Sequence, residues 1–213
     1  MRLGRDAAAD QQFRRALALE PNQPAALRAL GELEYLRRRY GASCALANAS
    51  IGADSYDPLS YALRARVRIQ QGEFRDAFSD AETAMRISGA PWSDALQVLV
   101  SANAATVDDA RLEARRVASE RLRPGAVMSV AEGVYTSLAF EALGDRDRAF
   151  EALRRIDPAG VQLGMALRDP GFDQMRKDAR FRRIVAAAGK PKLLETASPG
   201  DSAVKRQAGS VPP

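Results

Sequence analysis

The chain has 213 residues, of which 46% are hydrophobic and 28% charged, and its formal net charge is +5. This length and apolar content predict one sizeable globular domain rather than a disordered chain. Histidine is absent and Cys44 is the single cysteine, which excludes His-based acid–base catalysis, Ser-His-Asp and Cys-His nucleophiles, an internal disulfide and nearly all catalytic zinc sites. We therefore expect a protein that is not an enzyme and that holds no cofactor or metal.

The sequence also bears on location and on broad classes of partner. It has no run of about 18 apolar residues that would span a membrane, and its first residues lack the apolar core of a secretory signal. We expect a cytoplasmic protein without membrane contact. Nucleic-acid binding is not expected, because acidic residues interrupt the basic clusters and aromatics make up only 6% of the chain.

The first predicted helix covers residues 5–20, where Ala9, Phe13 and Ala16 recur at spacings of four and three. This spacing resembles that of the second helix of a tetratricopeptide unit whose first helix is missing, so residues 1–22 are interpreted as an incomplete first unit. A helix left without its partner exposes one apolar side. We expect self-association through residues 5–20, or fraying there.

Three predicted helix pairs follow, over residues 24–57, 58–90 and 91–122. In the first, Ser43, Ala47 and Ser50 stand where alanine, an aromatic residue and alanine are usual in such a unit, so looser packing is expected. In the second, the first helix ends at Gly72. The third lacks a glycine between its helices, and Thr106 with Asp109 predicts a capping box at the start of its second helix.

A fourth pair is predicted after Pro124. Ser129 and Glu132 have the spacing of a capping box, and Gly144 is placed to end that helix. The next helix should stop before Pro158. Farther on, Asp178 is expected to begin a short helix that covers the apolar edge of the last pair, and residues 189–213 are expected to form a disordered tail.

The spacing from Gly72 to Phe74, Ala77 and Ala84 resembles the tetratricopeptide repeat family, as does the recurrence of the units after 34 and then 33 residues. The stretch from Leu167 resembles the closing segment of many bacterial tetratricopeptide proteins. It contains an Asp-Pro at 169–170, a Phe-Asp at 172–173, and Arg176, Asp178, Arg180 and Phe181.

This resemblance implies an all-α fold, a right-handed α-solenoid of tetratricopeptide-like helix-turn-helix repeats with a C-terminal capping helix, over residues 23–188. It also implies a concave groove, lined by the first helix of each pair, that binds a protein or peptide. The groove positions carried over are Arg28, Glu32, Tyr35, Leu59, Arg66, Ile69, Gln70, Trp92, Leu99, Asn103, Val134, Leu138 and Glu141.

The predicted function is therefore a non-catalytic protein–protein interaction scaffold. The family's set of side chains that clamps a carboxylate is hinted at only by Arg66 and Asn103. An alternative is that the chain is the C-terminal sensor or regulatory half of a bacterial transcription regulator, cyclase or kinase, whose N-terminal effector domain is missing here. Similar closing segments and the missing first helix favour that alternative.

Overall fold

The computed structural model describes residues 2–123, 125, 127–156 and 161–188, and within them the chain forms α-helices and short 3-10 helices but no strand. The α-helices are α1 (Arg2–Leu19), α2 (Pro24–Leu36), α3 (Tyr40–Ala53), α4 (Pro58–Gln71), α5 (Phe74–Ser88), α6 (Pro91–Ala104), α7 (Asp108–Glu120), α8 (Val130–Ala142), α9 (Arg146–Arg154), α10 (Val161–Ala166) and α11 (Ala179–Ala187). Between α10 and α11 lie η1 (Pro170–Phe172) and η2 (Met175–Lys177). None of the described helices is both long and apolar enough to cross a membrane.

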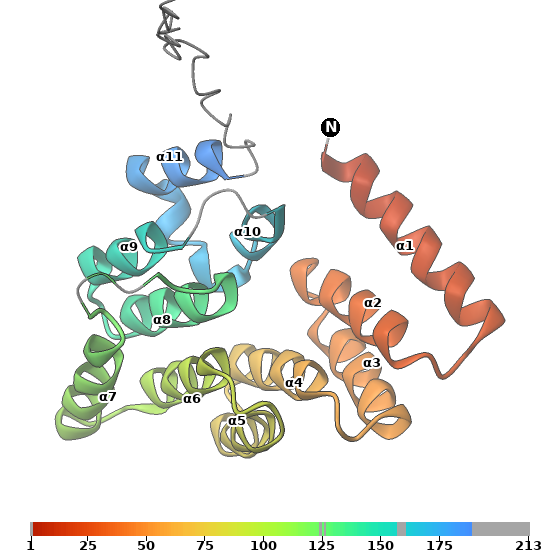
Figure 1. The fold of residues 1–213 in the computed structure, drawn as a ribbon, viewed down its shortest axis with the longest axis horizontal. Helices are drawn as coiled ribbons and strands as arrows, with labels where there is room; N and C mark the ends of the chain where they lie inside the picture. The colour runs from red at the N-terminus through yellow and green to blue at the C-terminus, as the bar shows by residue number, and fades with distance from the viewer. Residues whose placement is uncertain (1, 124, 126, 157–160, 189–213) are drawn as a thin grey trace, which may run out of the picture.

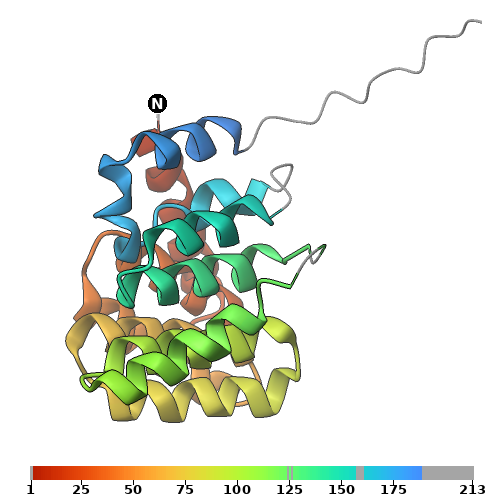
Figure 2. The ribbon, with the colours of Figure 1, turned by 90° about the vertical axis from the view of Figure 1, so that its left-hand side faces the viewer.

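The helices follow one another as a helical-repeat solenoid, which confirms the predicted all-α fold. Successive helices pack together from α2 to α6, and α8 then packs on α9. Helices α4 to α7 form one end of the molecule, while α8 and α9, then α10 and α11, lie progressively farther from it (Figures 1 and 2). The curve of this path gives the molecule a concave face between α2, α4, α6 and α8.

The pair α2 and α3 packs closely, so the expectation of looser packing is wrong. Ser43, Ala47 and Ser50 are fully buried, and the Ser43 hydroxyl donates a hydrogen bond to the carbonyl of Gly31 at 2.8 Å. A Cβ atom at Gly31 would lie 3.3 Å from the Cβ atom of Leu46 on α3. Small residues on both helices therefore bring the two backbones together.

The pair α4 and α5 has the predicted form. Gly72 ends α4 with a φ of 77°, a left-handed conformation that favours glycine. On α5, Ala77, Ala81 and Ala84 are all fully buried, which allows α5 to lie tightly against its neighbours. The arrangement accounts for the strict use of alanine at these positions.

The third predicted pair departs from a regular repeat. Helix α6 packs mainly on α8, whereas its contact with α7 is smaller, and α7 buries only Ala114 and Ala118. The predicted capping box is wrong, because the residue that precedes α7 is Val107 and no side chain caps this end. Helix α7 is thus displaced to the edge, and α8 occupies the place beside α6.

The C-terminal helices are capped largely as predicted. The Ser129 hydroxyl accepts a hydrogen bond from the backbone N–H of Glu132 at 3.2 Å, and Gly144 follows α8 with a φ of 79°. Asp178 accepts the N–H of Arg180 at 2.8 Å and so begins α11. Helix α10 was not predicted, and the predicted tail at 189–213 lies outside the described residues.

Helix α11 covers the end of the solenoid. Its Phe181 is only 2% exposed and its ring lies 5.3 Å, centroid to centroid, from that of Phe172 in η1. Both rings belong to the main hydrophobic core. The prediction of a C-terminal capping helix is therefore confirmed.

Helix α1 packs on α2. Its Asp10 pairs with Arg37 at 2.5 Å, next to the end of α2, and its Asp6 pairs with Arg168 at 2.5 Å, just after α10. The predicted apolar positions Ala9, Phe13 and Ala16 are each half-buried. Self-association through residues 5–20 stays a prediction, now for a helix that already contacts its own chain.

Candidate functional site

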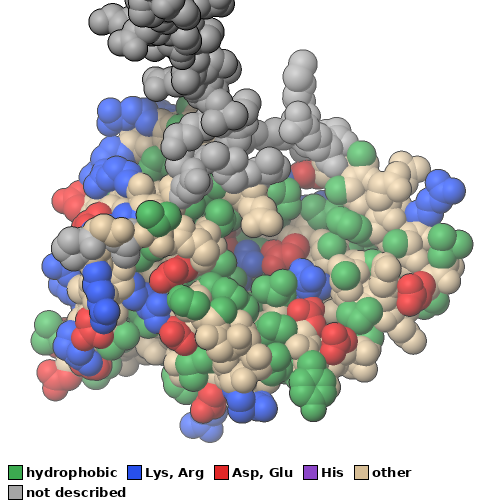
Figure 3. Space-filling model, viewed as in Figure 1, with side chains coloured by type: hydrophobic (Ala, Val, Ile, Leu, Met, Phe, Trp, Pro, Cys, Tyr) green, Lys and Arg blue, Asp and Glu red, His purple; other side chains and the backbone are tan. Residues whose placement is uncertain are grey.

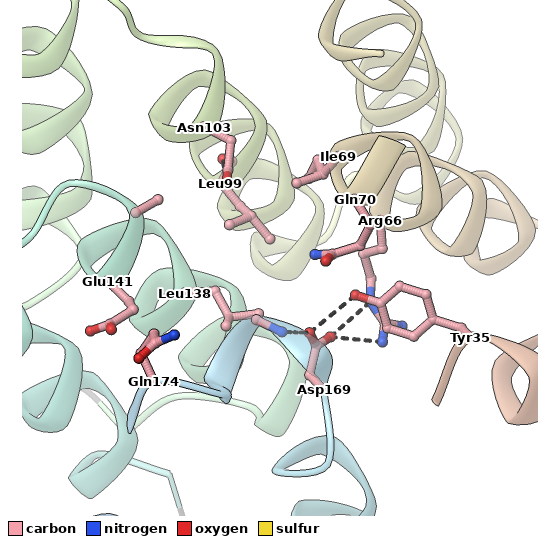
Figure 4. A pocket seen from close by; sticks show the side chains of 12 residues that line it. Tyr35, Arg66, Ile69, Gln70, Leu99, Asn103, Leu138, Glu141, Asp169 and Gln174 are labelled. Carbon is pink, nitrogen blue, oxygen red and sulfur yellow. Dashed lines mark hydrogen bonds and ion pairs between the residues drawn. The ribbon is translucent and has the colours of Figure 1, made fainter. Parts of the chain in front are cut away.

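The middle of the concave face is organised by one carboxylate, that of Asp169. The hydroxyl of Tyr35 on α2 donates to Oδ1 at 3.0 Å, and Nε and Nη2 of Arg66 on α4 donate to Oδ2 at 3.2 and 2.9 Å (Figure 4). The backbone N–H of Gly171 donates to Oδ1 at 2.8 Å. The carboxylate thus receives four hydrogen bonds from three separate parts of the chain.

Arg66 joins this carboxylate to a second one. Its Nη1 donates to both carboxylate oxygens of Glu32 at 2.9 and 3.0 Å, and its guanidinium carbon lies 4.3 Å from the centre of the Tyr35 ring. Burial by itself would lower the pKa of Arg66, but the charges of Glu32 and Asp169 outweigh it and raise that pKa well above its ordinary value. Arg66 therefore stays charged at any physiological pH.

Burial also keeps the phenol of Tyr35 neutral. The side chain is 1% exposed, and desolvation, reinforced by the charge of Asp169, raises its pKa well above the ordinary value. A neutral phenol donates a hydrogen bond to the carboxylate and adds no charge. The cluster of Glu32, Arg66 and Asp169 consequently carries one net negative charge.

Local sequence places Asp169 where it can make these contacts. Pro170 occupies the first position of η1, and Asp169 caps this turn by accepting the N–H of Gly171. Arg176 then fixes the segment from behind, since its Nη2 donates to the carbonyl oxygens of Leu167 and Asp169 at 3.2 and 2.8 Å. The segment enters the concave face as a rigid turn.

The first cavity lies on one side of the Arg66–Asp169 ion pair and has a volume of about 220 Å³. Eight of the thirteen predicted groove residues line it: Tyr35, Arg66, Ile69, Gln70, Leu99, Asn103, Leu138 and Glu141. They come from α2, α4, α6 and α8, as the resemblance implied. The rest of the lining comes from Ala142, Asp169, Gly171 and Gln174.

The second cavity, of about 320 Å³, lies on the other side of the same ion pair. The predicted residues Glu32 and Val134 line it together with Arg66. Three predicted positions line neither cavity. Arg28 pairs with Asp57 at 2.8 Å, Leu59 is 42% exposed, and Trp92 is half-buried against the main core.

The centre of the expected groove is occupied by the chain itself. Because Asp169 and the turn after it reach Tyr35 and Arg66, they divide the concave face into the two cavities. The sequence hinted that Arg66 and Asn103 bind the carboxylate of a partner, and the structure corrects this expectation. Arg66 holds the carboxylates of its own chain, and the Asn103 amide donates to the carbonyl of Leu99 in its own helix at 2.9 Å.

Asp169 and Gln174 are the polar side chains of the first cavity that the sequence interpretation missed. Asp169 was recognised only as part of the closing segment. The available signal was the combination of an Asp-Pro turn with Arg66, an arginine at a groove position. Only the curvature of the solenoid brings the two together.

The cluster of Arg37, Arg38 and Arg39 has a structural use. Arg37 pairs with Asp10 and with Glu34, and Arg39 pairs with Glu34 at 2.7 Å. Arg38 has a φ of 60° and pairs with Asp173 of the closing segment at 2.5 Å. These arginines tie the end of α2 to helices on either side of it.

The described residues contain no group of three or more His, Cys, Asp or Glu side chains arranged to hold a metal ion. The sequence matches no protein-family model and no curated protein. The geometry of the site is therefore the basis for the functional proposal.

Proposed function

We propose that this protein is a non-catalytic interaction scaffold that binds a segment of a protein or peptide in the first cavity. The observation that carries the proposal is the convergence of eight predicted groove positions, from four different helices, on one cavity. Their convergence supports a binding role for the concave face.

The chemistry of the lining suits a short stretch of polypeptide. Ile69, Leu99 and Leu138 give an apolar surface for one side chain, while Gln70 and Gln174 add amide groups at the edge (Figure 4). A side-chain amide both donates and accepts hydrogen bonds, so it can match the backbone N–H and C=O groups of an extended segment. A volume of about 220 Å³ suits a small portion of a partner rather than a large ligand.

We also propose that the chain is a divergent tetratricopeptide repeat protein. The close α2–α3 and α4–α5 pairs, the buried alanines of α5 and the glycine that ends α4 support this proposal. The α6–α8 contact is the main departure from a regular array.

Selection from a displayed library of random peptides, with the full chain as bait, tests the binding role. Asn103→Trp would fill the first cavity, and it removes no hydrogen bond to another helix among the described residues, because the amide donates to Leu99 within α6. Glu82→Trp, on the exposed side of α5, is the matched control. We expect selected peptides to bind Asn103→Trp at least about tenfold more weakly and the control unchanged. Failure to select any peptide, or equal binding to both variants, contradicts the proposal.

A further inference from the structure

The second cavity is a mostly apolar hollow with a charged floor. It lies between α2, α8 and α10, and its apolar lining consists of Leu36, Val130, Ala131, Val134, Met165 and Ala166 together with the ring of Tyr135. The charged side chains are Glu32, Arg66 and Asp169. Figure 3 shows this face, where charged side chains lie deep in a hollow and hydrophobic ones surround it.

The two carboxylates at the floor of the cavity differ in how many hydrogen bonds they accept and in how exposed they are. Asp169 is 2% exposed and receives four hydrogen bonds. Glu32 is 31% exposed, and among the described residues its oxygens accept only from Nη1 of Arg66. Each carboxylate oxygen has a second lone pair. Glu32 thus has acceptor capacity left on the side of the cavity.

The charged side chains at the floor of the second cavity do not balance one another. One guanidinium, that of Arg66, faces two carboxylates. The neighbouring arginines have carboxylate partners of their own. Arg168 pairs with Asp6, and Arg37 pairs with Asp10 and Glu34, which also pair with Arg14 and Arg39. Burial raises the pKa of Tyr135 to about 12, so its phenol is neutral and does not alter the balance. One net negative charge therefore borders an apolar volume of about 320 Å³.

We propose that the second cavity binds a cationic group, an ammonium or guanidinium, carried on a short apolar stem. The cation would lie against the open side of Glu32, and the stem against Val134, Met165 and the other apolar walls. An opposite charge is attracted strongly where apolar walls exclude water, and the stem gains from burial of its methylene groups. This site is separate from the first cavity and does not depend on the proposed peptide binding.

Ligand-observed NMR and calorimetry on the full chain at pH 7 test this with three probes of equal length: n-pentylammonium, 1-pentanol and pentanoate. We expect the ammonium to bind at least about tenfold more tightly than the alcohol, and pentanoate to bind weakest. Glu32→Gln keeps the size of the side chain but removes its charge, and it should reduce ammonium binding to the level of the alcohol. Glu82→Gln makes the same change on the exposed side of α5 and should have no effect.

Two further arms make the test decisive. Ala131→Phe narrows the cavity without touching the ion pairs, so it should weaken ammonium binding at least about tenfold while circular dichroism stays unchanged. A blocked Gly-Lys-Gly peptide, compared with its norleucine counterpart, tests whether a lysine side chain is taken as well as a small amine. Preference for either cation over its neutral counterpart supports the site. A preference for neither cation over its neutral counterpart, stronger binding of pentanoate than of the ammonium, or a cation preference that survives Glu32→Gln or Ala131→Phe overturns it.

Discussion

The hydroxyl of Tyr35 and the carboxylate of Asp169 form a buried hydrogen bond of 3.0 Å although 134 residues separate them in the sequence. In a simple repeat array each unit contacts only its neighbours. Here Arg38–Asp173 and Arg168–Asp6 join the same two regions. The first helix pair is thus tied directly to the closing segment, and the solenoid closes on itself.

Tyr35→Phe should destabilise the fold through this contact alone. The substitution keeps the ring and its packing against Arg66 but leaves buried Asp169 without one of its donors. We expect a loss of about 1–3 kcal/mol in the free energy of unfolding measured with urea. Tyr56→Phe is the control because Tyr56 is 80% exposed. Equal stability of Tyr35→Phe and the control would show that the closure contact contributes nothing.

Local sequence signals predicted the helix ends that depend only on the residues next to them. The αL glycines Gly72 and Gly144, the cap at Ser129 and the cap at Asp178 all lie where their residue types require them. The failed capping box at Thr106 is a shift of one residue, since the helix begins after Val107. Helix α7 packs on both α6 and α8. The local sequence pattern contains no information about these contacts, so it does not fix the first residue of the helix.

Ala77→Leu tests the tight α4–α5 contact. Ala77 is fully buried on α5, so three additional carbon atoms must displace side chains or backbone. We expect a cost of about 1–3 kcal/mol in urea unfolding. Ala42→Leu on α3, where the side chain is exposed, gives the matched control. A neutral effect at position 77 would mean that this contact can expand without strain.

Phe181→Ala tests the capping helix. The ring is 2% exposed and packs against Phe172, so truncation would leave a cavity next to the core. We expect a loss of about 3–5 kcal/mol, seen as a lower midpoint in thermal unfolding. Val127→Ala, whose side chain is 79% exposed, should change the midpoint little. Comparable midpoints for the two variants would show that α11 does not support the core.

The site was predicted in part, for a reason that the structure makes clear. Groove positions such as Leu99 and Leu138 follow from the resemblance to the tetratricopeptide family, because each lies on the first helix of a predicted pair, and both line the first cavity. Occupation of the groove by Asp169 depends on the accumulated curvature of several units. Small packing differences, such as the replacement of α7 by α8 beside α6, set that curvature, and no single unit encodes it.

Acid should release α1 before it unfolds the rest of the chain. Its hydrogen bond from Arg168 holds the pKa of Asp6 below the ordinary value of 3.8, and the hydrogen bond from Arg37 does the same for Asp10. A carboxyl group with a lower pKa in the folded state stabilises that state above its unfolded pKa. This contribution is lost as pH falls through the folded pKa. The attachment of α1 should therefore be intact at neutral pH and weaken below about pH 4.

Hydrogen exchange measured by mass spectrometry checks this, with rates corrected for the intrinsic effect of pH on exchange. Between pH 7 and pH 3, residues 6–19 should lose protection while the peptides of α4 and α5 keep theirs. The double variant Asp6→Asn and Asp10→Asn should show the same loss already at pH 7, because both ion pairs to Arg168 and Arg37 are gone. Salt should act in the same direction, since these pairs are partly exposed and therefore screened. If the double variant protects α1 as well as the original chain does at pH 7, apolar contacts such as those of Phe13 hold the helix in place and the ion pairs only accompany them.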